Sequence, residues 1–166
     1  SFFRSVAPSA ANAGWRDTDI QIDGPVVAEF QRLFMQTWNK QKGKPLGSKG
    51  YFPIVPVQGT ELVRAIGSTP DDPYSLIYLT LISAITNSEK QVCITNAYFV
   101  PDPQLLDALI GAAGRGVDVR LILPSRSDSG LAFHAGRSYY TQLLKGGVKI
   151  HERRGTPLHV KTAMVD

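Results

Sequence analysis

The amino-acid sequence predicts an α/β fold, in which a mixed or mainly parallel β-sheet is flanked by helices. From residue 91 onward, short β-rich segments alternate with segments of helical length, and this alternation is typical of a parallel sheet covered by helices. The composition supports a folded chain, since 43% of the 166 residues are hydrophobic and 19% are charged. These fractions disfavour both disorder and a coiled coil, and the length suits about one domain.

The beginning of the chain predicts one short strand and one helix. Residues 19–23 alternate isoleucine with polar residues, which is the period of a half-exposed strand. A helix is expected after Gly24 and Pro25, because four apolar residues follow at helical spacing and share one face: Val27, Phe30, Phe34 and Trp38. Residues 39–49 are rich in lysine and glycine, and we expect an exposed loop there.

The middle of the chain predicts less regular structure and then a second helix. Residues 51–59 are β-rich but contain two prolines, so they can form an edge strand at best. Residues 69–73 read TPDDP, which predicts a turn. The following segment, 74–86, is apolar around most of a helical circumference, and we expect a deeply buried helix there.

The second half of the chain carries the alternation of strands and helices. Asp102 and Pro103 have the residue types that begin a helix, and glycines follow the expected ends of both helices. The pattern predicts helices over residues 103–114 and 131–145. It predicts strands over residues 91–95, 117–123, 148–152 and 158–165.

Charge and cysteine content limit the function classes. Lysine and arginine total 18 against 14 acidic residues, and this mild excess permits a phosphate-bearing partner without requiring one. A single cysteine, Cys93, excludes a disulfide framework and a zinc-finger ligand set, and we expect it to be a small core residue. The longest apolar stretch, residues 76–85, is far shorter than the ~20 residues of a membrane span, and the first residues do not resemble a signal peptide.

One of the three histidines lies in a pattern that suggests chemistry. His134 and His151 have no neighbours that form a recognisable site, and we expect ordinary surface or hydrogen-bonded histidines. His159 stands in the expected last strand, LHVKTAMVD, where residues two apart share a face. His159 and Lys161 therefore lie side by side, and the alternate residues are expected to point into a core: Leu158, Val160, Thr162 and Met164.

A lysine beside a histidine suits phosphate chemistry. The ammonium of Lys161 can bind a phosphate oxygen, and its charge favours the neutral, nucleophilic imidazole of His159. Asp166 lies five positions beyond Lys161 and faces away on a continuous strand, so we expect it to anchor the strand end. The alternative is a histidine and a lysine that share the exposed face of an amphipathic strand by chance.

The segment HVKTAMVD resembles the HxKxxxxD signature of the phospholipase D superfamily. The preceding segments, NAYFVPDPQLLDALIGAAGRGVDVRLILPSRSD and GRSYYTQLLKGGVKIHE, are similar to the second catalytic half of bacterial cardiolipin synthases. WRDTDIQIDGPVVAEFQRLFMQTWN resembles the tail of the first half. The resemblance implies a phospholipase D-like, incomplete domain: residues 1–60 are the tail of a first repeat with a connecting loop, and residues 61–166 are the N-terminal part of a second repeat.

The resemblance also implies an activity and a set of site residues. It implies a phosphatidyltransferase that exchanges phosphodiesters on phosphatidylglycerol through a phosphohistidine, without a metal or other cofactor. The catalytic residues are then His159, Lys161 and Asp166, with His159 favoured as the general acid. Substrate-binding residues are expected after the strand that ends near residue 95, where open α/β sheets bind ligands: Asn96, Tyr98 and Phe99. Core packing is an equal alternative for Tyr98 and Phe99.

The partners implied are a phosphatidylglycerol-like phospholipid, a membrane surface and the missing other half of a longer chain, with no nucleic acid. The location implied is the bacterial cytoplasmic membrane, with peripheral attachment or an anchor outside this chain. Two alternatives stay open: a phospholipase D-type phosphodiesterase or nuclease, and a non-catalytic module that binds anionic lipid. Because only one His-x-Lys motif is present, we expect the chain alone to be inactive.

Overall fold

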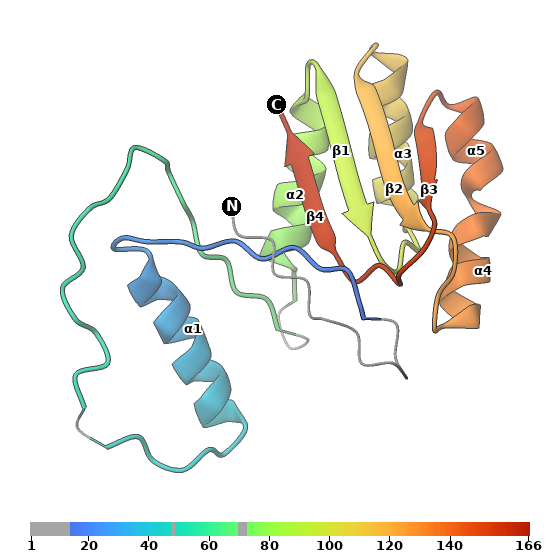
Figure 1. Cartoon of the computed structure of the whole chain (residues 1–166). Coiled ribbons are helices and arrows are strands. Elements are labelled where there is room, and N and C mark those ends of the chain that lie inside the picture. The colour runs from blue at the N-terminus through green and yellow to red at the C-terminus, as the bar shows by residue number, and fades with distance from the viewer. Residues whose placement is uncertain (1–13, 48, 70–72) are drawn as a thin grey trace. The chain divides into compact units, whose positions relative to one another are not determined.

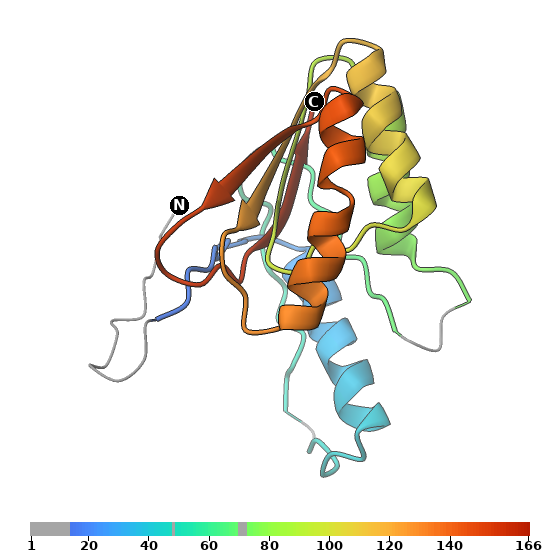
Figure 2. The ribbon, with the colours of Figure 1, turned by 90° about the vertical axis from the view of Figure 1, so that its right-hand side faces the viewer.

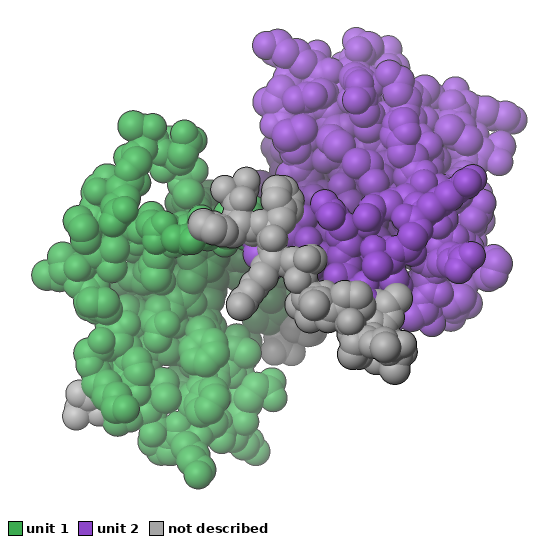
Figure 3. All heavy atoms as spheres, viewed as in Figure 1, with its two compact units in different colours: residues 1, 20–77 green, residues 2–19, 78–166 purple. Residues whose placement is uncertain are grey.

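The described residues form two compact units. The structure, a computed structural model, describes residues 14–47, 49–69 and 73–166. One unit contains residues 20–77, and the described part of the other contains residues 14–19 and 78–166 (Figure 3). The boundary between the units lies at Ile77 and Tyr78, later than the repeat boundary expected at residue 60. The assignment of the two parts to successive repeats stays a prediction.

The described residues of the first unit contain one complete helix, together with extended segments that form no strand. The amphipathic helix expected after Pro25 is confirmed as α1, Val27–Lys40. The strand expected over residues 19–23 is wrong, and residues 51–59 form no strand either. A strand needs a partner for its backbone groups, and no described segment pairs with these residues in a ladder. Of the expected turn over residues 69–73, positions 70–72 lie outside the described residues.

The second expected helix is present, but its predicted burial is wrong. It is α2, Leu76–Asn87, and Ile85 is its one buried residue. Leu76 is 58% exposed, because a helix buries its apolar surface only where another element covers it. None of the described helices is both long and apolar enough to cross a membrane.

The second unit is built on a four-stranded sheet with the order β3-β2-β1-β4 (Figure 1). The strands are β1 (Gln91–Asn96), β2 (Asp118–Pro124), β3 (Lys149–Arg153) and β4 (Lys161–Val165). β2 pairs in parallel with both β1 and β3, whereas β4 runs antiparallel to β1. The predicted mixed, mainly parallel sheet is therefore confirmed.

Helices lie on one side of this sheet (Figure 2). They are α2, α3 (Pro103–Gly114), α4 (Gly130–Ser138) and α5 (Tyr140–Lys145), and the core contains residues of both layers such as Leu109, Leu121 and Leu143. The single helix expected over residues 131–145 is instead two helices. The backbone N–H of Tyr139 donates to the carbonyl of Gly136, three residues back, and this tight turn ends α4 before α5 begins.

The other face of the sheet is less covered, and this corrects part of the prediction for the last strand. Leu158 and Val160 are buried as expected, but they precede β4. Thr162 and Met164 are exposed and lie opposite Thr95 and Cys93 in the register with β1. They do not enter a core, because the helices cover only the opposite face. Cys93 is half-buried on this same face and is not a core residue.

Candidate active site

The candidate site lies where β1 ends and the chain approaches β4. An N-terminal segment, residues 14–19, runs beside residues 157–159 there. The N–H of Arg16 donates to the carbonyl of Pro157 at 2.9 Å, and the N–H of His159 donates to the carbonyl of Arg16 at 2.9 Å. These backbone hydrogen bonds hold the segment against His159, although the two are far apart in the sequence.

Asp17 is the hydrogen-bond partner of the His159 side chain. The Nδ1 atom of His159 lies 2.8 Å from Oδ2 of Asp17. This contact with His159 is the main cause that lowers the pKa of the Asp17 carboxyl, so the carboxylate is ionised at neutral pH and can only accept. Nδ1 of His159 therefore carries the donated proton, and in the neutral ring Nε2 is left unprotonated. The ring of Trp15 stacks on the imidazole, with 4.8 Å between centroids.

Lys161 contacts the backbone of His159. Its Nζ donates a hydrogen bond to the His159 carbonyl at 2.7 Å. Nζ also lies 5.9 Å from the centroid of the Tyr98 ring, in a cation–π contact. The ammonium is thus held at the side of His159 by one carbonyl and one aromatic ring.

Of the three residues expected near the end of β1, Tyr98 contacts Lys161, and Asn96 holds the backbone of Tyr98. The hydroxyl of Tyr98 donates to Oδ1 of Asp128 at 2.7 Å, and this hydrogen bond raises the pKa of Tyr98 and lowers that of Asp128. Oδ1 of Asn96 accepts from the N–H of Tyr98 at 2.9 Å and fixes the turn that presents the ring. Phe99 is 6% exposed and packs in the hydrophobic core, as the alternative of core packing expected for this residue.

A cavity of about 50 Å³ adjoins His159. That volume holds a few water molecules or a small group such as a phosphate. Its lining combines the stacked Trp15 and His159 with the loop after β2: Trp15, Ala97, Tyr98, Arg126, Ser127, Asp128, Pro157, Leu158 and His159. A much larger cavity of about 510 Å³ lies within the first unit, but no histidine lines it.

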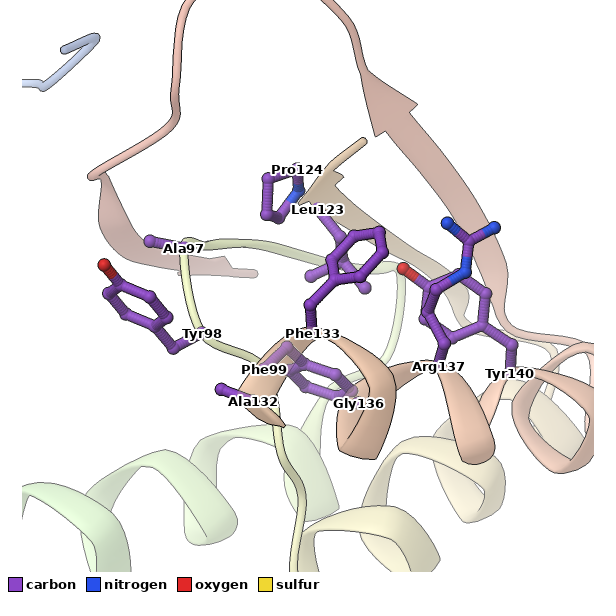
Figure 4. A pocket seen from close by; sticks show the side chains of 10 residues that line it. All are labelled: Ala97, Tyr98, Phe99, Leu123, Pro124, Ala132, Phe133, Gly136, Arg137 and Tyr140. Carbon is purple, nitrogen blue, oxygen red and sulfur yellow. The ribbon is translucent and has the colours of Figure 1, made fainter. Parts of the chain in front are cut away.

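A smaller cavity of about 20 Å³ lies next to Tyr98 on the side of α4 (Figure 4). Its wall includes Arg137, whose guanidinium lies 5.1 Å from the centroid of the Phe133 ring and 5.6 Å from that of Tyr140. Arg137 also forms an ion pair with Glu152 at 3.1 Å. The space is sufficient for about one water molecule, which is less than the cavity beside His159 holds.

The structure does not bring Asp166 to His159. Asp166 follows β4 at the end where Val165 pairs with Val92, whereas Lys161 pairs with Asn96 at the other end. Five residues of strand separate Lys161 from Asp166, or about 17 Å. The Asp166 carboxylate accepts from three backbone N–H groups before and in β1, those of Glu89 at 3.2 Å, Lys90 at 2.9 Å and Gln91 at 2.9 Å. These hydrogen bonds lower the pKa of Asp166, and the bond from the N–H of Gln91 has the largest effect.

Sequence reasoning missed several residues of this site, above all Asp17, which is 142 positions from His159. Trp15, Arg126 and Asp128 were missed as well. No spacing rule connects such distant segments, and a signal would have come only from knowing that residues 14–19 run beside residues 157–159. His134 and His151 are both exposed, as expected for surface histidines.

Comparison with known proteins places the chain in a family. The family described as "Cardiolipin synthase, PLD-like domain" matches residues 81–166, which is more than half of the chain. Cardiolipin synthases of Alkalihalophilus pseudofirmus and Geobacillus kaustophilus are 36% and 38% identical to it over 154 residues, or 92% of this chain. The chain spans 31% of the length of each of these relatives.

Among solved structures, a phospholipase D family member, Nuc from Salmonella typhimurium, has a TM-score of 0.45 and 27% identity. The aligned region covers 54% of this chain and 57% of the Nuc chain. The family match over residues 81–166 includes β1 to β4, with His159, Lys161 and Asp166. On this match, the chain belongs to the cardiolipin synthase, PLD-like domain family.

Proposed function

We propose that this chain supplies one half of a two-histidine phosphatidyltransferase site of the cardiolipin synthase type. The observation that carries the proposal is His159, oriented by Asp17 and flanked by Lys161, in a chain 36% and 38% identical to cardiolipin synthases over most of its length. The other histidine and lysine come from a longer protein that contains this chain. HVKTAMVD is then an HxKxxxxD motif.

His159 acts as the general acid in this proposal. The histidine of the other half attacks phosphorus with its lone pair, so that a N–P bond forms while the P–O bond to the leaving glycerol breaks. The imidazolium of His159 gives its Nε2 proton to the departing alkoxide. In the second step His159 takes the proton of the incoming alcohol, whose oxygen bonds to phosphorus as the N–P bond breaks. The carboxylate of Asp17 stabilises the imidazolium through Nδ1–H.

Lys161 stabilises the phosphoryl group during both steps. Its ammonium interacts with the non-bridging oxygens, where negative charge is concentrated in the transition state. The contacts with the His159 carbonyl and the Tyr98 ring fix the position of Nζ before substrate binds. Asp166 has a structural role, since its carboxylate is used by backbone N–H groups at the far end of β4.

The substrate class that we propose is a phosphatidylglycerol-like phospholipid at a membrane surface. No metal or organic cofactor takes part in the steps above. The location that we propose is the bacterial cytoplasmic membrane, with attachment through parts of the protein other than this chain. The names of the bacterial relatives support this choice over the phosphodiesterase, the nuclease and the lipid-binding module.

A chimera tests this function. The 154 aligned residues of the Geobacillus kaustophilus enzyme are replaced by the corresponding part of this chain, and cardiolipin formed from phosphatidylglycerol vesicles is measured. We expect the chimera to form cardiolipin and His159→Ala to lower the rate by about 10²- to 10⁴-fold, the usual effect of a positioned acid or base. A folded chimera that forms no cardiolipin, or one that tolerates His159→Ala, would contradict the proposal.

The chain by itself provides the complementary test. Because it contains one of the two histidines that the reaction needs, we expect no turnover of phosphatidylglycerol above that of its own His159→Ala variant. Release of glycerol or phosphatidic acid by the unmodified chain alone, at a rate that His159→Ala abolishes, would contradict the two-half site.

A further inference from the structure

We propose that Arg126 binds a second phosphodiester, that of the acceptor phospholipid, at the cavity beside His159. This inference rests on the proposed function and deepens it, because it says how the site selects a lipid alcohol over water as the acceptor. The residue lies in the loop between β2 and α4 and lines the same cavity as His159.

The charge of Arg126 has no acidic partner in the described part of the chain. Its side chain is exposed and makes no hydrogen bond or ion pair within the part of the chain that the structure describes. Other arginines of the same unit are engaged: Arg120 pairs with Asp118, Arg137 pairs with Glu152, and Arg115 donates to the carbonyls of Ile85 and Ser88. The guanidinium of Arg126 is therefore available to a ligand.

The carboxylates near this cavity are already used by other groups. Asp128 accepts from the Tyr98 hydroxyl at 2.7 Å and from the Ser127 hydroxyl at 3.4 Å, both at Oδ1. Asp17 is hydrogen-bonded to His159. Neither acid pairs with Arg126, so the cavity that Arg126 lines together with Tyr98 and His159 keeps one cation without an acidic partner.

The chemistry of the transfer brings a second anion to the site. The acceptor alcohol of one phosphatidylglycerol lies on the same glycerol as its own phosphodiester, so two phosphates come within one glycerol of each other at the moment of transfer. One phosphate occupies the position beside His159 and Lys161. A guanidinium presents a planar pair of N–H donors that matches two phosphate oxygens, and Arg126 is placed at the same cavity to bind the other phosphate.

Soluble headgroups test this assignment on the chain itself. Dissociation constants are measured by NMR titration with glycerophosphoglycerol, which has one phosphodiester, and with bis(glycerophospho)glycerol, which has two. We expect the second probe to bind about fivefold to tenfold more tightly, as one added charge-assisted contact allows. Arg126→Gln should remove this preference, because it should weaken the second probe more than the first.

Two variants separate this inference from the proposed function. Arg154→Gln is the matched control, since Arg154 is exposed, has no described partner and does not line the cavity. Lys161→Gln should weaken both probes. If Lys161→Gln changes neither affinity, the proposed phosphate site itself fails. If Lys161→Gln weakens both probes but Arg126→Gln behaves like Arg154→Gln, or the two probes bind equally well to the unmodified chain, only the role of Arg126 is overturned.

Discussion

At the scale of single residues, Lys161 is held in place before any substrate binds. Its ammonium donates to the His159 carbonyl and lies over the Tyr98 ring. In the chimera we expect Lys161→Ala to lower cardiolipin formation by about 10²- to 10³-fold, the usual effect of losing one preorganised donor to a developing charge. Lys161→Arg should restore little of this loss, because a planar guanidinium cannot occupy the position of a compact ammonium.

The control for this prediction is Lys149→Ala. Lys149 lies on β3, and its Nζ is paired with Asp118 at 2.8 Å. An exposed ion pair of this kind contributes little, so activity should stay near that of the unmodified chimera. Equal rates for Lys161→Ala and Lys149→Ala would remove Lys161 from the catalytic residues.

The residue scale also shows what local spacing can and cannot predict. The pairing of the His159 and Lys161 side chains is a prediction from spacing, because residues two apart on an extended chain share a side, and the structure adds a contact of the Lys161 ammonium with the His159 carbonyl. The position of Asp166 away from this pair followed from the same rule. Asp17 was not predictable, because its contact with His159 depends on a backbone pairing between segments that no local rule connects.

At the scale of elements, α4 lies unusually close to the loop that presents Tyr98. A Cβ on Gly136 would collide with the carbonyl oxygen of Phe99, which is backbone and cannot turn aside. We expect Gly136→Ala to lower the free energy of unfolding by about 1–3 kcal/mol, as overpacking does. Urea titration followed by circular dichroism measures this change.

Gly111→Ala in α3 is the matched control for that substitution. The nearest atom to an added Cβ there is Nη1 of Arg115, at 4.0 Å. Alanine is the better helix former, so this variant should be more stable by about 0.5–1 kcal/mol. If Gly136→Ala has the same free energy of unfolding as the unmodified chain, α4 and the loop can move apart without loss of stability. The position of the loop would then not be fixed by α4.

Asp166 ties β4 to the start of β1, and its contribution should depend on pH. Backbone N–H groups lower the pKa of Asp166 in the folded chain, and the N–H of Gln91 has the largest effect. The stabilisation that the Asp166 carboxylate provides is therefore present above the ordinary pKa of 3.8. That stabilisation is lost as the pH falls through the lowered value. We expect Asp166→Asn to be less stable than the unmodified chain at pH 7, with the difference shrinking below pH 4.

Asp107→Asn is the comparison for this pH series. Asp107 is an exposed carboxylate on α3 without a described hydrogen-bond partner, so its replacement should leave stability unchanged at both pH values. A difference between Asp166→Asn and the unmodified chain that stays constant from pH 7 to pH 3 would contradict the role of the charged carboxylate.

Helices and strands were predictable where the residues that determine them are close together in the sequence. The beginning of α3 was predicted from Asp102 and Pro103, and the Asp102 carboxylate does accept from the N–H of Leu105 at 2.8 Å. The burial of α2 was not predictable, because an apolar sequence does not say whether another element covers the helix. The residues of 19–23 alternate like a strand, but a strand also needs a neighbour with free backbone groups.

At the scale of the whole molecule, the sequence predicted the α/β class and the mainly parallel sheet, but not how the chain divides. Residues 14–19 belong with 78–166 rather than with the residues that follow them. Composition contains no signal for this division, because it results from the backbone pairing of Arg16 with residues 157–159. The candidate site therefore depends on a contact between the two ends of the chain's sequence.

The most direct test of this account is the protonation of the His159 ring in the folded chain. Nitrogen-15 NMR of the side chain distinguishes a protonated from an unprotonated ring nitrogen. At a pH where the ring is neutral, we expect Nδ1 to be protonated and Nε2 unprotonated, because the Asp17 carboxylate can only accept. Asp17→Ala, or deletion of residues 1–19, should return the ring to a mixture of the two forms. A ring protonated at Nε2 in the unmodified chain, or one that Asp17→Ala leaves unchanged, would contradict the site.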